Sequence, residues 1–374
     1  MTTFKNTWRG LIMACLVTAG INTNPALAET APVWQRVSLH VADKLRAYDF
    51  PVYANHDLKA DLTKIRHVIF VQHGIQRNGD DYFAAAMQLL KTAGLPDEQV
   101  LIIAPNFPGT PDQAKGFDRM PVWSVQGWTG GDFALAGAAT PAQLSSLSVL
   151  DDLALMLADK ARLPLLEKIT FAGHSGGGQL MHRYAVLNHV DERLRSNGIA
   201  VQYVIANPSS YLYFTPERPT AGGGFVPYDA RLCAAYDDYR YGMQQMVAYA
   251  NKMSAEDLYR RHMQRHVTYL VGSKDNDPNH RVLDKSCGAE AEGPNRYERA
   301  HAYWQYETYL AKKLPPVSPA RNTSSDQPLR RYFDVIGIGH DQEGMFGSQC
   351  GLQAVFGVST TGNAKSAACK VVTP

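Results

Sequence analysis

The stretch Ile169-Thr-Phe-Ala-Gly-His-Ser-Gly-Gly-Gly-Gln-Leu180 decides the fold that we expect for this chain. An apolar run rich in β-forming residues breaks at Gly173-His174-Ser175-Gly176-Gly177 and then continues with a helical pattern. A sharp corner between a strand and a helix strains the backbone of its serine and brings the two elements close together, so only residues without bulk can flank it. Such a corner exposes the serine hydroxyl above the sheet. Ser175 is therefore our candidate nucleophile.

Short apolar runs rich in valine, isoleucine and aromatic residues recur along the chain and alternate with helical patterns. Runs of this kind are typical of parallel strands that are buried on both faces. The sequence therefore predicts an α/β fold, with a mostly parallel central sheet and helices on both faces. Alternation of polar and apolar residues at 34–53 predicts an antiparallel hairpin at the sheet edge. The expected strands are residues 66–72, 100–104, 168–172, 201–206, 266–271 and 331–336, and the clearest helices lie near 147–157 and at 296–314.

Between residues 207 and about 259 no strand pattern occurs, and glycine, proline and tyrosine crowd together. A block of this kind between two sheet strands predicts a cap, or lid, inserted into the domain. Its aromatic residues either line an apolar cleft or pack the cap onto the body. Among them we take Tyr211, Tyr213 and Phe214 as candidate substrate-binding residues.

Residues 1–28 have the features of a signal peptide. Two basic residues precede an apolar stretch at 11–19, and Ala26-Leu27-Ala28 offers small residues to a signal peptidase. The apolar stretch is shorter than the roughly 20 residues that a membrane-spanning helix needs. We therefore expect cleavage near Ala28, export to the periplasm or the medium, no stable membrane span in the mature chain, and one mature domain at residues 29–374.

Removal of that segment takes Cys15 with it and leaves an even number of cysteines in a chain bound for an oxidising compartment, which predicts two disulfides. Three pairings are possible, and we prefer the one in which each bond closes a loop of moderate length. No cysteine lies in a C-x-x-C pair or beside a matching histidine spacing, so no metal site is expected. The preferred pairs are Cys233 with Cys287 and Cys350 with Cys369.

The charges of the chain are nearly balanced. Lysine and arginine number 37, aspartate and glutamate 35, and the net charge is +2. The sequence has no run of basic residues of the kind that binds a nucleic acid. We therefore expect a small ligand that is neutral or mixed in charge.

A serine hydroxyl needs a base, and the base needs a third group to orient it. For this type of corner the order along the chain is serine, then aspartate or glutamate, then histidine. Gly272-Ser-Lys-Asp275-Asn-Asp277 directly follows an expected strand, where open α/β sheets gather their sites. We expect Asp275 to be the acid, with Asp277 as the alternative. A calcium loop is the competing interpretation, but the oxygen-rich positions that should follow are missing.

The expected base is His340, which follows the last strand in Val335-Ile-Gly-Ile-Gly339-His340. Two glycines there allow a sharp turn that swings the imidazole back over the sheet. Of the other histidines, His174 is expected to pack away from the serine, His280 lies close to the aspartates in a loop, and His301 falls in a helical pattern.

Acyl transfer also needs hydrogen-bond donors that face the tetrahedral oxyanion. One should be the backbone N–H of Gly176, at the start of the helix. The other should follow an early strand, and His73-Gly74 ends such a run, so the N–H of Ile75 or Gln76 is expected to complete the oxyanion hole.

Over about residues 60–345 the chain resembles the α/β-hydrolase superfamily, through the His73-Gly74 turn, the serine corner, the acid turn and Gly339-His340. The resemblance implies that Ser175, Asp275 and His340 form a catalytic triad and that the block after residue 207 occupies the place of a lid. It implies ester hydrolysis of the EC 3.1.1 class as the commonest activity, without a cofactor. The chain lacks the full His-Gly-Gly-Gly turn of lipase-like members.

The leading hypothesis is an exported serine hydrolase that cleaves small or polymeric carboxylic esters through an acyl-enzyme. A serine peptidase and an acyltransferase of the same fold remain as alternatives. A non-catalytic binding module would lack a member of the triad, and a dehalogenase or epoxide hydrolase would carry aspartate at position 175. The site, rather than the fold, must separate these classes.

Overall fold

The strand that carries the serine corner, β5 (Lys168–His174), lies at the centre of the sheet in the computed structural model. Among the described residues the sheet has nine strands, in the order β1-β2-β4-β3-β5-β6-β9-β10-β11. The strands from β4 to β10 in this order are parallel, while β1, β2 and β11 run antiparallel to their neighbours. The other strands are Gln35–His40 (β1), Ala47–Ala54 (β2), His67–Gln72 (β3), Val100–Pro105 (β4), Ala200–Ala206 (β6), His266–Gly272 (β9), Arg330–Val335 (β10) and Cys369–Val371 (β11).

All of the described residues belong to one unit, which spans residues 32–374. The expected signal peptide at residues 1–28 lies outside them. No helix of the described part is both long and apolar enough to cross a membrane. The structure describes residues 34–40, 47–117, 119–137, 140–250, 252–314, 328–358 and 366–374.

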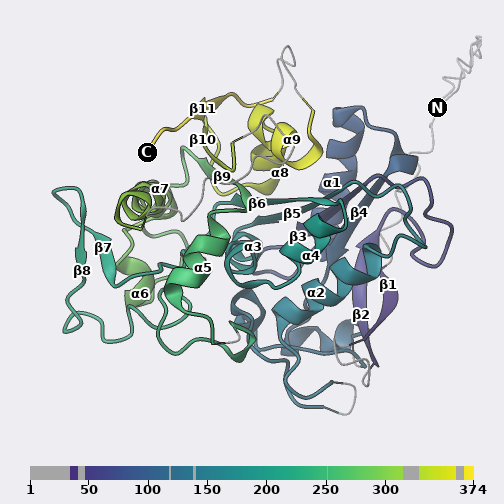
Figure 1. Ribbon diagram of the computed structural model, residues 1–374, viewed down its shortest axis with the longest axis horizontal. Helices are drawn as coiled ribbons and strands as arrows, with labels where there is room; N and C mark the ends of the chain where they lie inside the picture. Colours follow the sequence, from purple (N-terminus) through teal and green to yellow (C-terminus); the bar gives the residue numbers. More distant parts are fainter. Residues whose placement is uncertain are drawn as a thin grey trace, which may run out of the picture. The chain divides into compact units, whose positions relative to one another are not determined.

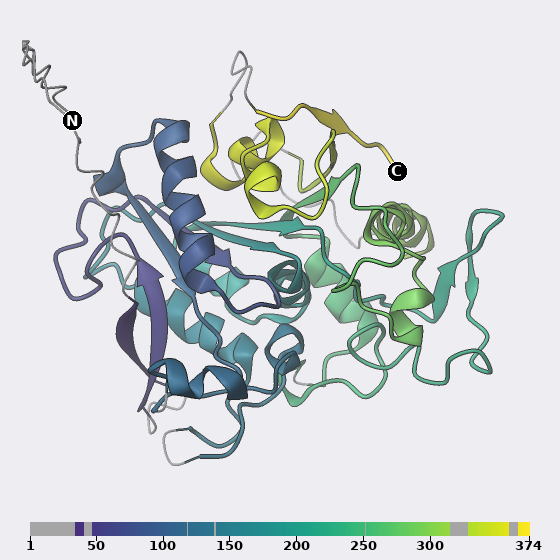
Figure 2. The same ribbon diagram turned by 180° about the vertical axis from the view of Figure 1, so that it is seen from behind.

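Helices cover both faces of the sheet, as the sequence predicted (Figures 1 and 2). Helices α1, α8 and α9 pack on one face, and α2, α3, α4, α5 and α7 pack on the other. The helices are Gly79–Ala93 (α1), Ser146–Leu157 (α2), Gly176–Leu187 (α3), Asp191–Ser196 (α4), Ala255–His262 (α5), Cys287–Glu290 (α6), Arg296–Lys313 (α7), Gln342–Phe346 (α8) and Gln349–Phe356 (α9), with short 3₁₀ turns at Asp97–Gln99, Thr110–Lys115, Gly127–Gly130 and Ala248–Ala250.

The two faces of the central strands differ in the size of their side chains. On the face towards α3, the rings of Phe70 and Phe171 stack with centroids 4.7 Å apart, and Phe171 and Tyr203 stack at 5.5 Å. On the face towards α1 the neighbouring positions are smaller, as at Val71 and Ala172. Since successive side chains of a strand point to opposite faces, these nearly continuous apolar runs fill both layers of the core.

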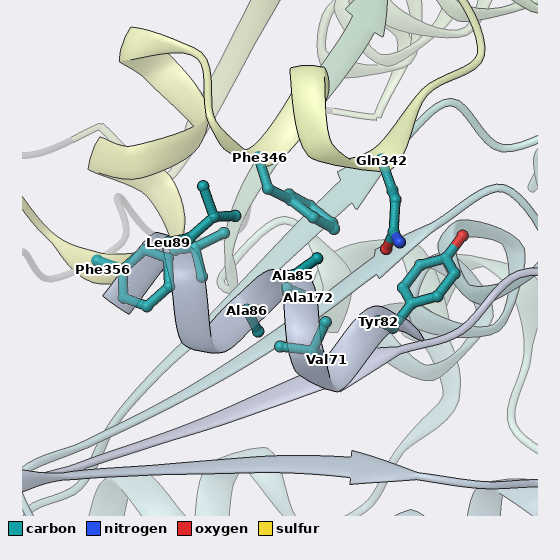
Figure 3. Close-up of a pocket in the computed structure, with 10 residues that line it drawn as sticks. Val71, Tyr82, Ala85, Ala86, Leu89, Ala172, Gln342, Phe346 and Phe356 are labelled. Carbon is teal, nitrogen blue, oxygen red and sulfur yellow. The ribbon is translucent and has the colours of Figure 1, made fainter. Parts of the chain in front are cut away.

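Helix α8 follows directly after the turn that carries His340, and its packing therefore helps to hold that turn. Figure 3 shows Phe346 of α8 and Phe356 of α9 around the same apolar pocket as Leu89 of α1, with Val71 and Ala172 of the sheet. This apolar contact joins the C-terminal helices to the body of the domain.

The six expected inner strands and the hairpin at residues 34–53 are confirmed, each within two residues of its expected bounds. The expectation that residues 207–259 contain no strand is wrong. Glu217–Pro219 (β7) and Phe225–Pro227 (β8) form a short antiparallel hairpin that lies apart from the central sheet (Figure 1). Strands of three residues are too short for an alternating pattern to identify them.

Both disulfides have the preferred pairing. Cys233 bonds to Cys287, and Cys350 bonds to Cys369. The first bond ties the segment after β6 to helix α6, and the second ties α9 to the edge strand β11. By restricting the unfolded chain, each should contribute about 3–4 kcal/mol to stability.

Candidate active site

Ser175 lies at a strained corner between β5 and α3. Its backbone has φ 60° and ψ −121°, a conformation that residues other than glycine rarely adopt. The glycines around it permit the close approach of strand and helix. A Cβ atom at Gly173 would overlap the carbonyl group of Gly177, and one at Gly177 would overlap the carbonyl group of Gln72. The corner therefore has the nucleophile-elbow geometry that the sequence predicted.

The structure brings Ser175, His340 and Asp275 together at the carboxyl ends of β5, β10 and β9. Ser175 Oγ lies 2.8 Å from His340 Nε2, and His340 Nδ1 lies 2.7 Å from Asp275 Oδ2. The carboxylate accepts a hydrogen bond from Nδ1–H, which leaves Nε2 free to accept one from the serine hydroxyl. All three side chains are largely buried, so bulk water competes little for these contacts.

Asp275 is held in its ionised form by its partners. Burial raises the pKa of its carboxyl group, but the hydrogen bond from His340 and the charge of Arg296 outweigh burial, so the pKa lies below 3.8. Arg296 Nη1 lies 3.2 Å from Asp275 Oδ1, and the Arg296 side chain is fully buried. A second hydrogen bond, from Arg296 Nε to Ser209 Oγ at 2.9 Å, orients the guanidinium group.

His340 is neutral at neutral pH. Burial has the largest effect and lowers its pKa, the hydrogen bond to Asp275 opposes that effect, and the nearby charge of Arg296 lowers the pKa further. The result is a pKa below the usual 6.5. A neutral imidazole that faces a hydroxyl group is a competent general base.

Asp277, the alternative acid, does not contact the histidine. It is exposed, and its carboxylate accepts a hydrogen bond from the backbone N–H of Asn279 at 2.8 Å. His280 lies nearer the centre than we expected, because its ring centroid is 5.1 Å from that of His340 and Arg296 donates to its Nδ1. His301 instead contacts Asp334.

Asn207, at the end of β6, links the loops that carry the acid and the base. Its Oδ1 accepts a hydrogen bond from the N–H of Gly272 at 2.8 Å, and its Nδ2 donates to the carbonyl of Gly339 at 3.1 Å. Its backbone has a positive φ of 46°, which asparagine tolerates better than most residues. Sequence reasoning missed Asn207, although an asparagine directly after a buried strand is a signal that could have identified it.

Two candidate oxyanion donors lie beside the serine. Ile75 and Gly176 both line the pocket at Ser175, and a Cβ atom built on Gly176 would lie 3.1 Å from the backbone nitrogen of Ile75. The Ile75 N–H donates to no acceptor among the described residues, so it is available to a ligand. Gln76 follows it but does not line the pocket.

The turn before Ile75 is held by His73, which is fully buried. His73 Nδ1 donates to the carbonyl of Gly74 at 2.9 Å, and Nε2 accepts from the N–H of Phe107 at 3.0 Å. Burial lowers the pKa of His73 to about 4, so the ring stays neutral and keeps this tautomer. His73 thus has a structural role in shaping the turn.

The aromatic residues that we selected as substrate contacts do not line this pocket, and that prediction is corrected. Tyr211, Tyr213 and Phe214 are 1%, 0% and 3% exposed, respectively. They pack against the helix layer, where Tyr211 stacks on Tyr303 of α7 with centroids 4.5 Å apart. They directly follow a buried strand, so the chain has not yet left the core when it reaches them. The aromatic residue of this segment that does line the pocket is Tyr241.

Most of the remaining pocket lining is polar, with Val282 and Leu283 as apolar members, and sequence reasoning missed it. The pocket has a volume of about 330 Å³ and includes Gln179 and Arg183 of α3. These residues follow Ser175 at intervals of four, which places all three along one side of the helix. That spacing is visible in the sequence and could have indicated the lining.

No protein-family model matches the chain, and no curated protein matches its sequence. The solved structures that are similar to it include two that cover most of the chain. The poly(3-hydroxybutyrate) depolymerase LpqC from Bordetella parapertussis is 21% identical, with a TM-score of 0.54 over 84% of this chain and 87% of that chain. Poly(aspartic acid) hydrolase-1 from Sphingomonas sp. KT-1 is 19% identical, with a TM-score of 0.56 over 87% of this chain and 99% of that one. With the strand order and the serine corner, these likenesses show that the chain has the α/β-hydrolase fold.

Proposed function

We propose that this protein is a serine hydrolase that cleaves carboxylic esters through an acyl-enzyme. The observation that supports this proposal most is the hydrogen-bonded series Ser175–His340–Asp275, with contacts of 2.8 Å and 2.7 Å. A nucleophile, a neutral base and an ionised orienting group in this order are what acyl transfer to serine requires.

In the first half-reaction, His340 Nε2 takes the hydroxyl proton while Ser175 Oγ forms a bond to the ester carbonyl carbon. The carbonyl π electrons move to its oxygen, which becomes the tetrahedral oxyanion. When the oxyanion collapses, the bond to the alkoxy oxygen breaks, and His340 returns the proton to that oxygen. Alcohol leaves, the acyl group stays on Ser175, and Asp275 stabilises the transient imidazolium.

In the second half-reaction, water takes the place of the alcohol. His340 removes a proton from water as its oxygen attacks the acyl carbon, and the proton then passes to Ser175 Oγ as the acyl bond breaks. In both halves the N–H groups of Ile75 and Gly176 donate to the oxyanion. Donors of this kind typically lower the barrier by about 3 kcal/mol each.

The segment at residues 207–259 serves in this proposal as the cap over the site. It contributes Ser209, Arg240 and Tyr241 to the pocket beside Ser175, and a disulfide ties it to α6. The two disulfides favour an oxidising compartment, which supports export of the mature chain to the periplasm or the medium.

The direct test is Ser175→Ala in the purified protein without residues 1–28. The variant should lose both labelling by a fluorophosphonate and turnover of short p-nitrophenyl esters, whereas Ser196→Ala, at an exposed serine on α4, should keep both. Unchanged labelling of Ser175→Ala would refute the assignment of the nucleophile.

In the same assay Asp275→Asn should lower kcat by about 10⁴-fold, because the imidazole loses its orienting acceptor. Asp277→Asn should remain active, and equal activity of the two variants would refute the assignment of the acid.

The substrate class is tested with a panel of esters of increasing chain length, polymeric esters and peptides. The names of the two similar structures state polymer hydrolysis, so poly(3-hydroxybutyrate) and poly(aspartic acid) belong in the panel. Hydrolysis of esters but not of peptides supports the esterase. Cleavage of peptides alone would favour a peptidase, and transfer of the acyl group to an added alcohol in preference to water would favour an acyltransferase.

A further inference from the structure

The pocket beside Ser175 contains a buried cation that has no counterion among the described residues. Arg183 lies two helical turns beyond Ser175 on the same side of α3, about 12 Å along the helix axis. Because side chains on a helix lean towards its N-terminus, the guanidinium group of Arg183 reaches back towards the serine. Arg183 is 1% exposed and lines the pocket.

The hydrogen bonds of Arg183 are made to neutral groups. Nη1 donates to the carbonyl of Thr129 at 2.9 Å, Nη2 donates to Ser210 Oγ at 3.1 Å, and Nε has no partner among the described residues. No carboxylate of the described part forms an ion pair with Arg183, in contrast to Arg296, which pairs with Asp275 at the same site. An arginine keeps its charge when buried, and an unpaired buried charge is costly.

The other charged groups at the pocket leave an excess of positive charge. Arg240 Nη2 pairs with Asp132 Oδ2 at 2.7 Å, so its charge is balanced. Arg281 is exposed and forms no hydrogen bond or ion pair with the described residues. The carboxylate that lines the pocket, Asp284, accepts hydrogen bonds from Tyr241 Oη and Ser286 Oγ, each at 2.8 Å.

Among the described residues that line the pocket, the two unpaired arginines Arg183 and Arg281 and the carboxylate of Asp284 leave one positive charge in excess. We propose that the pocket binds a carboxylate group of the substrate, held by Arg183 and Arg281, so that the preferred substrates are esters that also carry a carboxylate. This inference rests on the proposed ester hydrolysis at Ser175, and it replaces the neutral or mixed-charge ligand that composition suggested with an anionic one. A single carboxylate matches the excess charge, and the volume of about 330 Å³ suits a short chain.

The test compares esters that differ only in charge. Monoethyl esters of succinic, glutaric and adipic acid are compared with the same esters in which the free carboxylate is a primary amide. A second series places the carboxylate, or its amide, on the alcohol portion of a butyrate ester. The wild-type protein should hydrolyse the carboxylate form with a higher kcat/KM by about tenfold or more in at least one series, as expected for charge-assisted hydrogen bonds.

Substitutions of Arg183 and Arg281 then test whether these residues cause the preference for the carboxylate form. Arg183→Gln should reduce the ratio of carboxylate to amide kcat/KM by about tenfold or more, and Arg281→Gln should reduce it in the same direction. Arg231→Gln is the matched control, because Arg231 is an exposed arginine outside the pocket that pairs with Asp229. It should leave the ratio unchanged.

If Arg183→Gln does not fold, Arg281→Gln and the salt dependence of the wild type decide the question. Added salt should lower kcat/KM for the carboxylate esters and leave the amide forms unaffected, since screening weakens attraction between charges. Equal rates for the carboxylate and amide forms in both series would overturn the carboxylate pocket while leaving the esterase intact. Failure to hydrolyse any ester would instead count against the proposed function.

Discussion

At the scale of single residues, the proposed chemistry depends on charges that hold each other in place. Arg296 stabilises the ionised form of Asp275, and Asp275 fixes the tautomer of His340 through the hydrogen bond of 2.7 Å. Burial and the nearby cation keep the imidazole neutral, so Nε2 can accept the proton of Ser175. Loss of any one of these groups changes the protonation of the next.

The pH dependence of the reaction follows from His340. Burial and the charge of Arg296 lower the pKa of His340 below 6.5, and only the neutral imidazole can act as the base. As the pH falls through that pKa the imidazole is protonated, so kcat/KM for a neutral p-nitrophenyl ester should fall with a midpoint below pH 6.5. The profile is measured from about pH 4.5 to about pH 8, with circular dichroism to show that the fold persists. A midpoint above 6.5 would contradict the inferred environment of His340.

At the scale of elements, the strands of the central sheet position the loops that carry the candidate catalytic residues. The ends of β5, β9 and β10 lie at one edge of the sheet because these strands are parallel. Asn207 joins the acid loop and the histidine turn directly, and α8, which follows the histidine turn, packs on α1 (Figure 3). The acid loop and the histidine turn are therefore linked to each other through the residue that follows β6.

Asn207→Gly should reduce activity without unfolding the protein. Glycine accepts the positive φ of 46° at this position, so the change removes mainly the amide that holds Gly272 and Gly339. We expect kcat to fall by about tenfold or more while KM changes little, because small displacements of reacting groups are costly. Lys252→Gly is the matched control, since Lys252 also has a positive φ, at 57°, but is exposed and does not line the pocket. Equal kcat in the two variants would show that the amide of Asn207 does not position the histidine turn.

At the scale of the whole molecule, two disulfides join parts of the chain that the sheet alone does not hold. Cys233–Cys287 spans 54 residues and Cys350–Cys369 spans 19. The Cys233–Cys287 bond closes the longer loop, so it restricts the unfolded chain more. This bond also connects the proposed cap to the rim of the pocket.

Replacement of both members of a pair by serine should lower the free energy of unfolding. We expect a loss of about 4 kcal/mol for Cys233→Ser with Cys287→Ser and about 3 kcal/mol for Cys350→Ser with Cys369→Ser, following the loop lengths. Denaturant unfolding of both double variants measures the losses, and wild-type protein under a reductant should approach their combined effect. No loss in either variant would show that the bonds do not constrain the unfolded chain.

The sequence by itself determined the six inner strands, the edge hairpin, the serine corner and the candidates Ser175, Asp275 and His340. The strands and the serine corner follow from local patterns, because apolar runs and glycines at a tight turn involve residues that are near one another. The acid and the base follow from their order along the chain after two of these strands. The α/β-hydrolase fold predicted from them is shown by the structure and its similarity to solved folds.

Only the tertiary structure decided which other side chains meet at the site. Arg296 reaches Asp275 and Asn207 reaches Gly339, although nothing in the sequence near these residues requires either contact. Arg183 forms no ion pair with a carboxylate of the described residues, which its spacing from Ser175 does not reveal. Tyr211, read as a substrate contact, is instead stacked in the core. Such contacts depend on how elements far apart in the chain pack, and burial and charge pairing are properties of that packing rather than of any local run of residues.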